Sequence, residues 1–341
     1  MEKLPEEKFR NVSRRKVILV AVLPVVFFFM FNTFFYFYFH FYNPNEYYFL
    51  LNRKLSLLKK IDRKIDWLIL GDSSGNQGID PSIISDSLGG SSVNLCTYAD
   101  MTLIDDCWML DYLIKKDLAP SNVIISRVYD TWSRSVNYTL YSQYPASWVI
   151  FNRNKPEVPP PAGTRFETIV NHLFPVIHQK RQVINLIEHP SEFFTEPVHV
   201  ETDGFFRYQG EADPYGVRRD ARGHLDYVSK YDVKIGHYNL AALKFLQEVS
   251  AREGINIYLC NSPVYDSLLL DRQFSAFYER LTDSLETYTE GFPNFKYINH
   301  PATPFPDSLL QNVDHVTEQG SVIFTDLIIK QIKQSTKMES F

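Results

Sequence analysis

The hydrophobic residues are distributed most unevenly near the start of the chain. Residues 17–39 carry no charge, and only Pro24, Asn32 and Thr33 interrupt the apolar run. A helix of this length, rising about 1.5 Å per residue, crosses the ~30 Å hydrocarbon core of a bilayer. The run ends in Phe and Tyr rather than in the small residues of a signal-peptide cleavage site, so it predicts an uncleaved transmembrane anchor.

The basic residues beside this run predict its orientation. The tail 1–16 ends with Arg14, Arg15 and Lys16, whereas the basic residues on the other side begin only at Arg53. Positive charge close to a span favours the cytoplasmic side of the membrane. We therefore expect a single-pass protein with a cytoplasmic N-terminal tail and an extracytoplasmic main domain.

Residues 40–65 form the next segment of the pattern. Leu51, Leu55, Leu58 and Ile65 recur at helical spacing, and basic residues occupy the other face. The segment is predicted to be an amphipathic connector. It lies either near the membrane or against the main domain, as an ordinary domain helix would.

From residue 66 onward, short apolar runs alternate with segments of helical spacing. This alternation is typical of βαβ units. It predicts an α/β domain over 66–335, a three-layer sandwich with a mainly parallel sheet. The predicted strands lie within 67–75, 91–100, 121–132, 255–265 and 295–300, and the predicted helices within 101–120, 239–254, 272–291 and 317–334.

The alternation is interrupted at about 141–235. A proline-rich stretch comes first, a helical pattern covers 167–187, and residues 199–224 are mostly polar. A segment of this length inside a compact domain indicates an insertion or a lid.

The first strand of the domain ends in Gly-Asp-Ser-Ser-Gly, residues 71–75. In α/β sheets, ligands bind at the carboxyl ends of the strands, so Ser73 lies where chemistry is expected. A serine hydroxyl needs a base, normally histidine, within hydrogen-bond reach. Of the nine histidines, His315 lies just before the last predicted helix, where a loop can fold over this edge of the sheet.

These segments together resemble the SGNH/GDSL-type hydrolases. The stretches LILGDSSGNQGIDPSII and SSVNLC are similar to the first two signature blocks, GINIYLCNSPVY to a late strand, and NVDHVTEQG to the closing Asp-x-x-His block. The resemblance covers about 66–135 and 237–335. It is greatest to the membrane-anchored, extracytoplasmic branch that contains DltD-like and alginate O-acetyltransferase-like proteins.

The resemblance implies roles for particular residues. Ser73 matches the nucleophile, with Ser74 as its nearest competitor, and His315 matches the base. The backbone N–H of Ser73 would be one donor of the oxyanion hole. The oxyanion glycine of the second block falls at Cys96 or Ala99 in this sequence.

The sequence departs from the family pattern at the residue that orients the base. The aspartate of Asp-x-x-His is replaced by Asn312, which can accept the imidazole N–H bond but adds no negative charge. Asp314, next to His315, is a substitute, although neighbouring side chains usually diverge. Asp307 is a further candidate.

A second departure concerns the asparagine of the third signature block, which has no counterpart. The segment SRVYDTW offers Arg127, Tyr129 and Asp130 instead. A missing oxyanion donor typically costs ~10²–10³ in rate.

The resemblance implies acyl transfer through an acyl-Ser73 intermediate onto a cell-envelope polymer or exopolysaccharide, with a membrane acyl-donor protein as a plausible partner. Two alternatives stay open. One is a plain esterase or deacetylase in which water is the acceptor. The other is a catalytically silent envelope scaffold or binding protein, which Asn312 and the missing third-block asparagine favour.

Composition excludes several other classes of function. The net charge of −5 implies no general nucleic-acid affinity. Three cysteines, Cys96, Cys107 and Cys260, lack C-x-x-C spacing and lie in apolar contexts, so buried free thiols are expected rather than a zinc site. Asp105 and Asp106 are interpreted as charges at a helix N-terminus rather than metal ligands. No cofactor or metal is implied.

Overall fold

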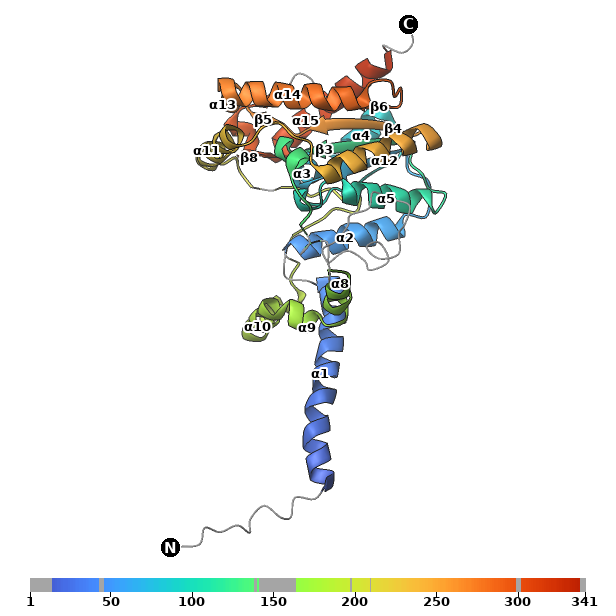
Figure 1. Ribbon diagram of the computed structural model, residues 1–341, viewed down its shortest axis with the longest axis vertical. Helices are drawn as coiled ribbons and strands as arrows, with labels where there is room; N and C mark the ends of the chain where they lie inside the picture. The colour runs from blue at the N-terminus through green and yellow to red at the C-terminus, as the bar shows by residue number, and fades with distance from the viewer. Residues whose placement is uncertain are drawn as a thin grey trace.

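A long N-terminal helix projects from an α/β domain in the computed structural model (Figure 1). The structure describes residues 14–42, 46–137, 140, 164–196, 198–208, 210–298 and 302–337. The helix, α1, covers Arg14–Tyr42. Within the described residues, Ile18–Phe39 is the one segment long and apolar enough to cross a membrane.

The domain is built on one central sheet in which every neighbouring pair of strands is parallel. This confirms the predicted α/β class. The strand order is β2-β1-β3-β4-β6, so the chain first adds β2 on one side of β1 and then β3 on the other. The five strands are β1 (Trp67–Gly71), β2 (Ser92–Asn94), β3 (Asn122–Arg127), β4 (Asn256–Asn261) and β6 (Phe295–Tyr297).

The central strands are apolar because both faces of the sheet are covered. All residues of β1 are buried, as are all but the first of β3 and β4. β3 and β4 end before the predicted segments 121–132 and 255–265 do. The run after β3 turns into the 3₁₀ helix η2 (Tyr129–Ser133), and the run after β4 continues in β5 (Val264–Tyr265).

The helices of the repeating pattern lie close to their predicted positions. α12 stops at Gly254, whose φ of 67° is left-handed and suits glycine. α5 packs on α12, whereas α15 packs on α3 and α4. The four predicted helices are α5 (Ile104–Ile114), α12 (His237–Glu253), α14 (Arg272–Thr289) and α15 (Glu318–Lys337). Three further helices were not predicted: α3 (Ser73–Gly78), α4 (Pro81–Leu88) and α13 (Asp266–Leu269).

Small elements complete the carboxyl side of the sheet. A 3₁₀ helix, η1, covers Ala99–Met101 after β2. β5 pairs with β7 (Pro304–Phe305), and β8 (Leu310–Asn312) pairs antiparallel with β9 (His315–Val316). A short 3₁₀ helix, η4 (Asp307–Leu309), leads into β8.

The insertion contains more helix than its sequence predicted. Its polar part forms α11 (Pro214–Lys230), which packs against β8 and α14. The sequence pattern does not predict this helix, because it contains two glycines and few apolar residues. The earlier part forms α8 (Thr164–Leu173), α9 (Pro175–His178), α10 (Lys180–Glu188) and η3 (Pro190–Phe194), whereas the proline-rich stretch before Thr164 lies outside the described residues.

The predicted connector contains α2 (Glu46–Lys60), and this helix packs into the core of the domain. Leu51, Leu55 and Leu58 are buried in the same cluster as the central strands. The face expected to be basic and solvated is interrupted by Lys54, whose side chain is fully buried.

Lys54 holds three segments together. Its ammonium donates to the backbone oxygens of Asn94, at 3.0 Å, and of Gly204 in the insertion. Gly204 is left-handed, and a Cβ there would lie 2.0 Å from the Asn94 oxygen, so only glycine permits this approach. Burial lowers the pKa of Lys54 to about 7.

The depressed pKa predicts how stability depends on pH. Between about pH 7 and pH 10.5 the unfolded chain binds a proton at Lys54 that the folded chain has released, so the free energy of unfolding should rise with pH. Urea unfolding at pH 7 and pH 9.5 measures this rise. We expect Lys54→Met to remove it and Lys60→Met, at an exposed position of the same helix, to retain it. An equal rise in all three proteins would contradict the assignment.

Candidate active site at the carboxyl end of β1

The site forms where the order of strands changes direction. β1 lies between β2 and β3, so the crossover connections on its two sides leave the sheet in opposite directions. Doubly wound sheets bind ligands in the crevice outside the carboxyl ends of the strands at this switch point. The Gly-Asp-Ser-Ser-Gly segment begins at the last residue of β1 and enters α3.

The two serines of this turn have different roles. Ser74 is buried, and its backbone N–H and hydroxyl both donate to Asp72 Oδ1, at 3.0 and 2.5 Å. Ser73, the first residue of α3, is partly exposed. In the part of the chain that the structure describes, no hydrogen bond engages its hydroxyl. Ser73 is therefore the serine available to a substrate.

Asp72 holds the turn against the loop that follows β3. Its Oδ2 atom accepts hydrogen bonds from the N–H of Val128, at 2.8 Å, and from the hydroxyl of Thr131, at 3.1 Å. Gly71 lets the two strand ends approach, because its φ is 138° and a Cβ would lie 1.9 Å from the backbone oxygen of Ser126. The position of Ser73 is thus set by buried contacts on both sides.

His315 lies in the short hairpin formed by β8 and β9, and β9 packs against α3. The structure therefore brings the predicted base next to the helix that begins with Ser73. His315 Nδ1 is 2.7 Å from Asp314 Oδ1 and 2.9 Å from Asn312 Oδ1. Among the described residues, no hydrogen bond joins the Ser73 hydroxyl to the imidazole.

Electrostatics identify Asp314 as the charged partner of His315. Burial alone would raise the pKa of Asp314, but the adjacent imidazole more than offsets this and lowers it to about 2. Burial alone would lower the pKa of His315, yet Asp314 and, more weakly, Asp72 raise it. A negative charge therefore faces Nδ1, although position 312 holds asparagine.

Asn312 organises the turn that makes this contact. Its Oδ1 atom accepts from the backbone N–H groups of Asp314, at 3.1 Å, and His315, at 2.9 Å. This tight turn directs two neighbouring side chains toward each other, contrary to the expectation that they would diverge. Asp307, the third candidate, instead pairs with Arg218 of α11, at 2.7 Å.

The candidate oxyanion donors are not equivalent. The N–H of Cys96 is donated to Asn94 Oδ1, at 3.0 Å, so this N–H is already engaged and the sequence prediction for Cys96 is not supported. Within the described residues, no hydrogen bond engages the N–H of Ser73 or of Ala99. Ser73 and Ala99 therefore remain as candidate donors.

A buried ion cluster lies beneath the serine turn. Arg127, the last residue of β3, contacts Asp105 Oδ1 at 3.0 Å and Asp106 Oδ2 at 2.5 Å. The other oxygen of Asp106 accepts the N–H of Gly71, at 3.0 Å. Both aspartates lie in the first turn of α5, as predicted, but their partner is this arginine. No group of metal-ligating side chains occurs in the described residues.

Polar residues near Asp314 include two that the sequence analysis named, Tyr129 and Asp130, and one that it did not, His224. Asp130 pairs with Arg134, at 2.7 Å, and Tyr129 bonds His224 Nδ1, at 2.7 Å. Asp130, His224 and four neighbours line an open hollow between η2 and α11. Tyr129 and Asp130 could be found because they lie in the segment compared with the third signature block. His224 could not, because the sequence does not show where the insertion lies relative to the sheet.

Comparisons with known proteins assign no family to this chain. No protein-family model matches the sequence, and no curated protein matches it.

Proposed function

We propose that this protein is a membrane-anchored serine acyltransferase or carboxylic-ester hydrolase of the SGNH/GDSL type. The observation that carries the proposal is a free, partly exposed Ser73 hydroxyl on α3, which packs against the strand holding the His315–Asp314 pair. Its acceptor would be a cell-envelope polymer or an exopolysaccharide. The domain would be a three-layer sandwich, with its helices on both faces of the sheet.

The proposed reaction has two steps. His315 takes the proton of Ser73 as the hydroxyl oxygen attacks the acyl carbonyl, and the donor's alcohol leaves with that proton, giving acyl-Ser73. His315 then deprotonates the acceptor hydroxyl, which attacks the ester and returns Ser73 to its free form. The N–H groups of Ser73 and Ala99 would stabilise the oxyanion in both steps.

The proposed setting follows from α1 and its flanks. The apolar segment Ile18–Phe39 would be a single membrane span, with the basic N-terminal residues in the cytoplasm and the domain outside it. A membrane acyl-donor protein would be the partner that supplies the acyl group. Water is an alternative acceptor, which the partial exposure of Ser73 favours.

A fluorophosphonate probe tests the proposal, because it labels only activated serines. We expect the full chain in detergent micelles to be labelled, and Ser73→Ala and His315→Ala to lose the label, since the first lacks the nucleophile and the second its base. Ser74→Ala is the matched control at the adjacent hydroxyl and should still be labelled.

An unlabelled wild type with a cooperative unfolding transition would contradict the proposal and favour a silent scaffold. Once labelling is established, p-nitrophenyl acetate is supplied with and without an added polysaccharide, and the fate of the acetyl group separates the two acceptors. Acyl groups recovered on the polysaccharide indicate transfer, and free acetate alone indicates hydrolysis.

A further inference from the structure

We propose that α8, α9, α10 and η3 form a second membrane-binding element that inserts into the same bilayer as α1. We call these four elements, residues 164–194, the platform. The inference depends on the membrane assignment of α1 made above, but not on the chemistry of Ser73. Its ligand is the acyl-chain region of a lipid bilayer.

The platform packs along α1 rather than over the serine site. Phe35 and Phe39 of α1 form a buried apolar cluster with Val183 and Leu186 of α10. Nearer the N-terminus of α1, Phe28 stacks on Phe174, with ring centroids 6.2 Å apart. Figure 1 shows α8, α9 and α10 beside the domain-proximal part of α1.

The length of α1 places this contact inside the hydrocarbon. From Phe28, the first contact with Phe174, to Phe39, the end of the apolar segment, the helix rises about 16 Å. The uncharged stretch before Phe28 is also about 16 Å long. A bilayer core is ~30 Å thick, so this stretch alone is too short to cross it. Arg14, Arg15 and Lys16 end that stretch. If α1 spans the bilayer, part of the platform must lie at hydrocarbon depth.

The one amide in the apolar segment supports this placement. The break between α8 and α9 leaves the carbonyl of Leu173 without a helical partner, and an unpaired backbone group in lipid costs several kcal/mol. Asn32, which is buried against the platform, donates its side-chain amide to that carbonyl at 2.6 Å. The N–H of Phe174 donates to the backbone oxygen of Val170, at 2.8 Å. These two backbone groups at the break are therefore satisfied without water.

The platform carries several apolar side chains that the rest of the described structure leaves exposed. Six of its apolar residues are each more than half exposed: Phe166, Leu173, Ile177, Ile184, Ile187 and Phe194. Single exposed apolar residues are normal, but a group of six on a short segment marks an interaction surface. Lys180 and Arg181, at the start of α10, are long enough for their charged ends to reach the interface from below it.

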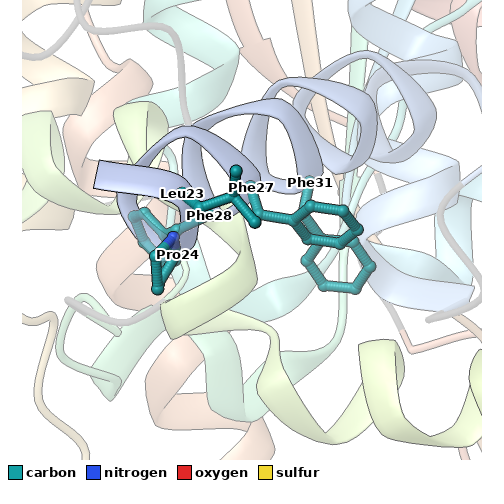
Figure 2. A pocket seen from close by; sticks show the side chains of 5 residues that line it. All are labelled: Leu23, Pro24, Phe27, Phe28 and Phe31. Carbon is teal, nitrogen blue, oxygen red and sulfur yellow. The ribbon is translucent and has the colours of Figure 1, made fainter. Parts of the chain in front are cut away.

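Exposed apolar residues of α1 lie beside the platform. Figure 2 shows Leu23, Pro24, Phe27, Phe28 and Phe31 around an apolar hollow on that helix. Phe28 belongs both to this hollow and to the contact with Phe174. Because exposed apolar residues of the span lie beside the platform where Phe28 stacks on Phe174, the occupant we assign is the lipid that surrounds the span rather than a protein.

Site-specific labelling in lipid nanodiscs tests the platform. The native cysteines are buried, so a cysteine introduced at Ile177 or Ile187 can be labelled selectively with an environment-sensitive fluorophore. Val20→Cys, on the exposed face of α1, is the lipid control. Leu270→Cys, an apolar residue exposed on the α/β domain, is the water control. The quenchers are a doxyl-labelled phosphatidylcholine and aqueous iodide.

We expect the doxyl lipid to quench most of the fluorescence at Ile177→Cys, Ile187→Cys and Val20→Cys, and little at Leu270→Cys. Quenching of the two platform labels by iodide alone, with Val20→Cys quenched by lipid, would overturn the inference and leave the anchor intact. Protection of the platform labels from both quenchers would also overturn it, because a protein would then cover the surface. If Val20→Cys itself were quenched by iodide alone, the membrane assignment of α1 would fail as well.

Discussion

Replacing Asp314 with asparagine should slow acylation of Ser73 by ~10⁴-fold, the cost of the same change in a serine-protease triad. The physical reason is that Asp314 Oδ1, 2.7 Å from His315 Nδ1, supplies the only carboxylate found to contact the imidazole in the described residues. Without it the imidazole loses both its orientation and the charge that stabilises its protonated form. The measurement is the rate of p-nitrophenyl acetate turnover or of fluorophosphonate labelling.

The pH dependence of this rate gives an independent check. His315 acts as a base only when neutral, so the wild-type rate should rise with pH through a pKa that Asp314 has raised above its usual value. Asp314→Asn removes that effect, and the midpoint should shift to lower pH. A midpoint that does not move would show that Asp314 is not the partner of His315.

Two further variants separate charge from geometry. Asp314→Asn combined with Asn312→Asp returns the carboxylate to the position it has in the family pattern, 2.9 Å from Nδ1, and should recover part of the rate. Asp307→Asn, which removes only the pair with Arg218, is the matched control and should leave the rate unchanged. Loss of activity in the Asp307 variant would indicate that the hairpin is generally sensitive to charge.

Replacing Arg127 with methionine should lower the free energy of unfolding by about 3–5 kcal/mol, because it leaves two buried carboxyl groups without their cation. Arg127, Asp105 and Asp106 are all fully buried, so water cannot take the place of the guanidinium. Urea unfolding in detergent micelles, followed by tryptophan fluorescence, measures the change. Arg252→Met, at an exposed arginine, is the control and should change stability by less than about 0.5 kcal/mol.

The loss should depend on pH in a defined direction. Burial raises the pKa of Asp106 to about 8, so from about pH 4 to pH 8 the folded chain holds a proton that the unfolded chain releases, and this group reduces stability as pH rises. Without Arg127 the pKa rises further, and the decline should continue above pH 8. Neutralising the pair as well, with Asp105→Asn and Asp106→Asn, should recover part of the stability. If Arg127→Met were as stable as the wild type at every pH, this account would be contradicted.

The parts of the fold that could be predicted are those set by local apolar pattern. The strands of the central sheet and the helix ending at Gly254 follow from burial on both faces and from a left-handed cap. The ends of the strands could not be predicted, because the apolar residues after β3 and β4 pack around the site rather than in the sheet. α11 was missed because its buried residues, such as Val217 and Val228, are too few to produce a clear helical pattern.

The site shows the same division between local and long-range information. The sequence identified Ser73 and His315 as residues to be brought together, and the contact of α3 with β9 agrees with that prediction. It could not choose between Asn312 and Asp314, because the choice depends on a turn that Asn312 itself forms. Nor could it show that Lys54 is buried, since its partners Asn94 and Gly204 are distant in the chain.

The packing of α2 into the domain limits how far Ser73 can move relative to α1. Only three residues, 43–45, separate α1 from α2, and three residues span at most ~11 Å even when fully extended. If α1 spans a membrane as proposed, so short a separation would keep the domain within a thin layer beside the membrane surface. Under the proposed function, an acceptor polymer would be modified only where it passes through that layer. The distance of Ser73 from the lipid surface would then determine which part of a growing polymer is acylated.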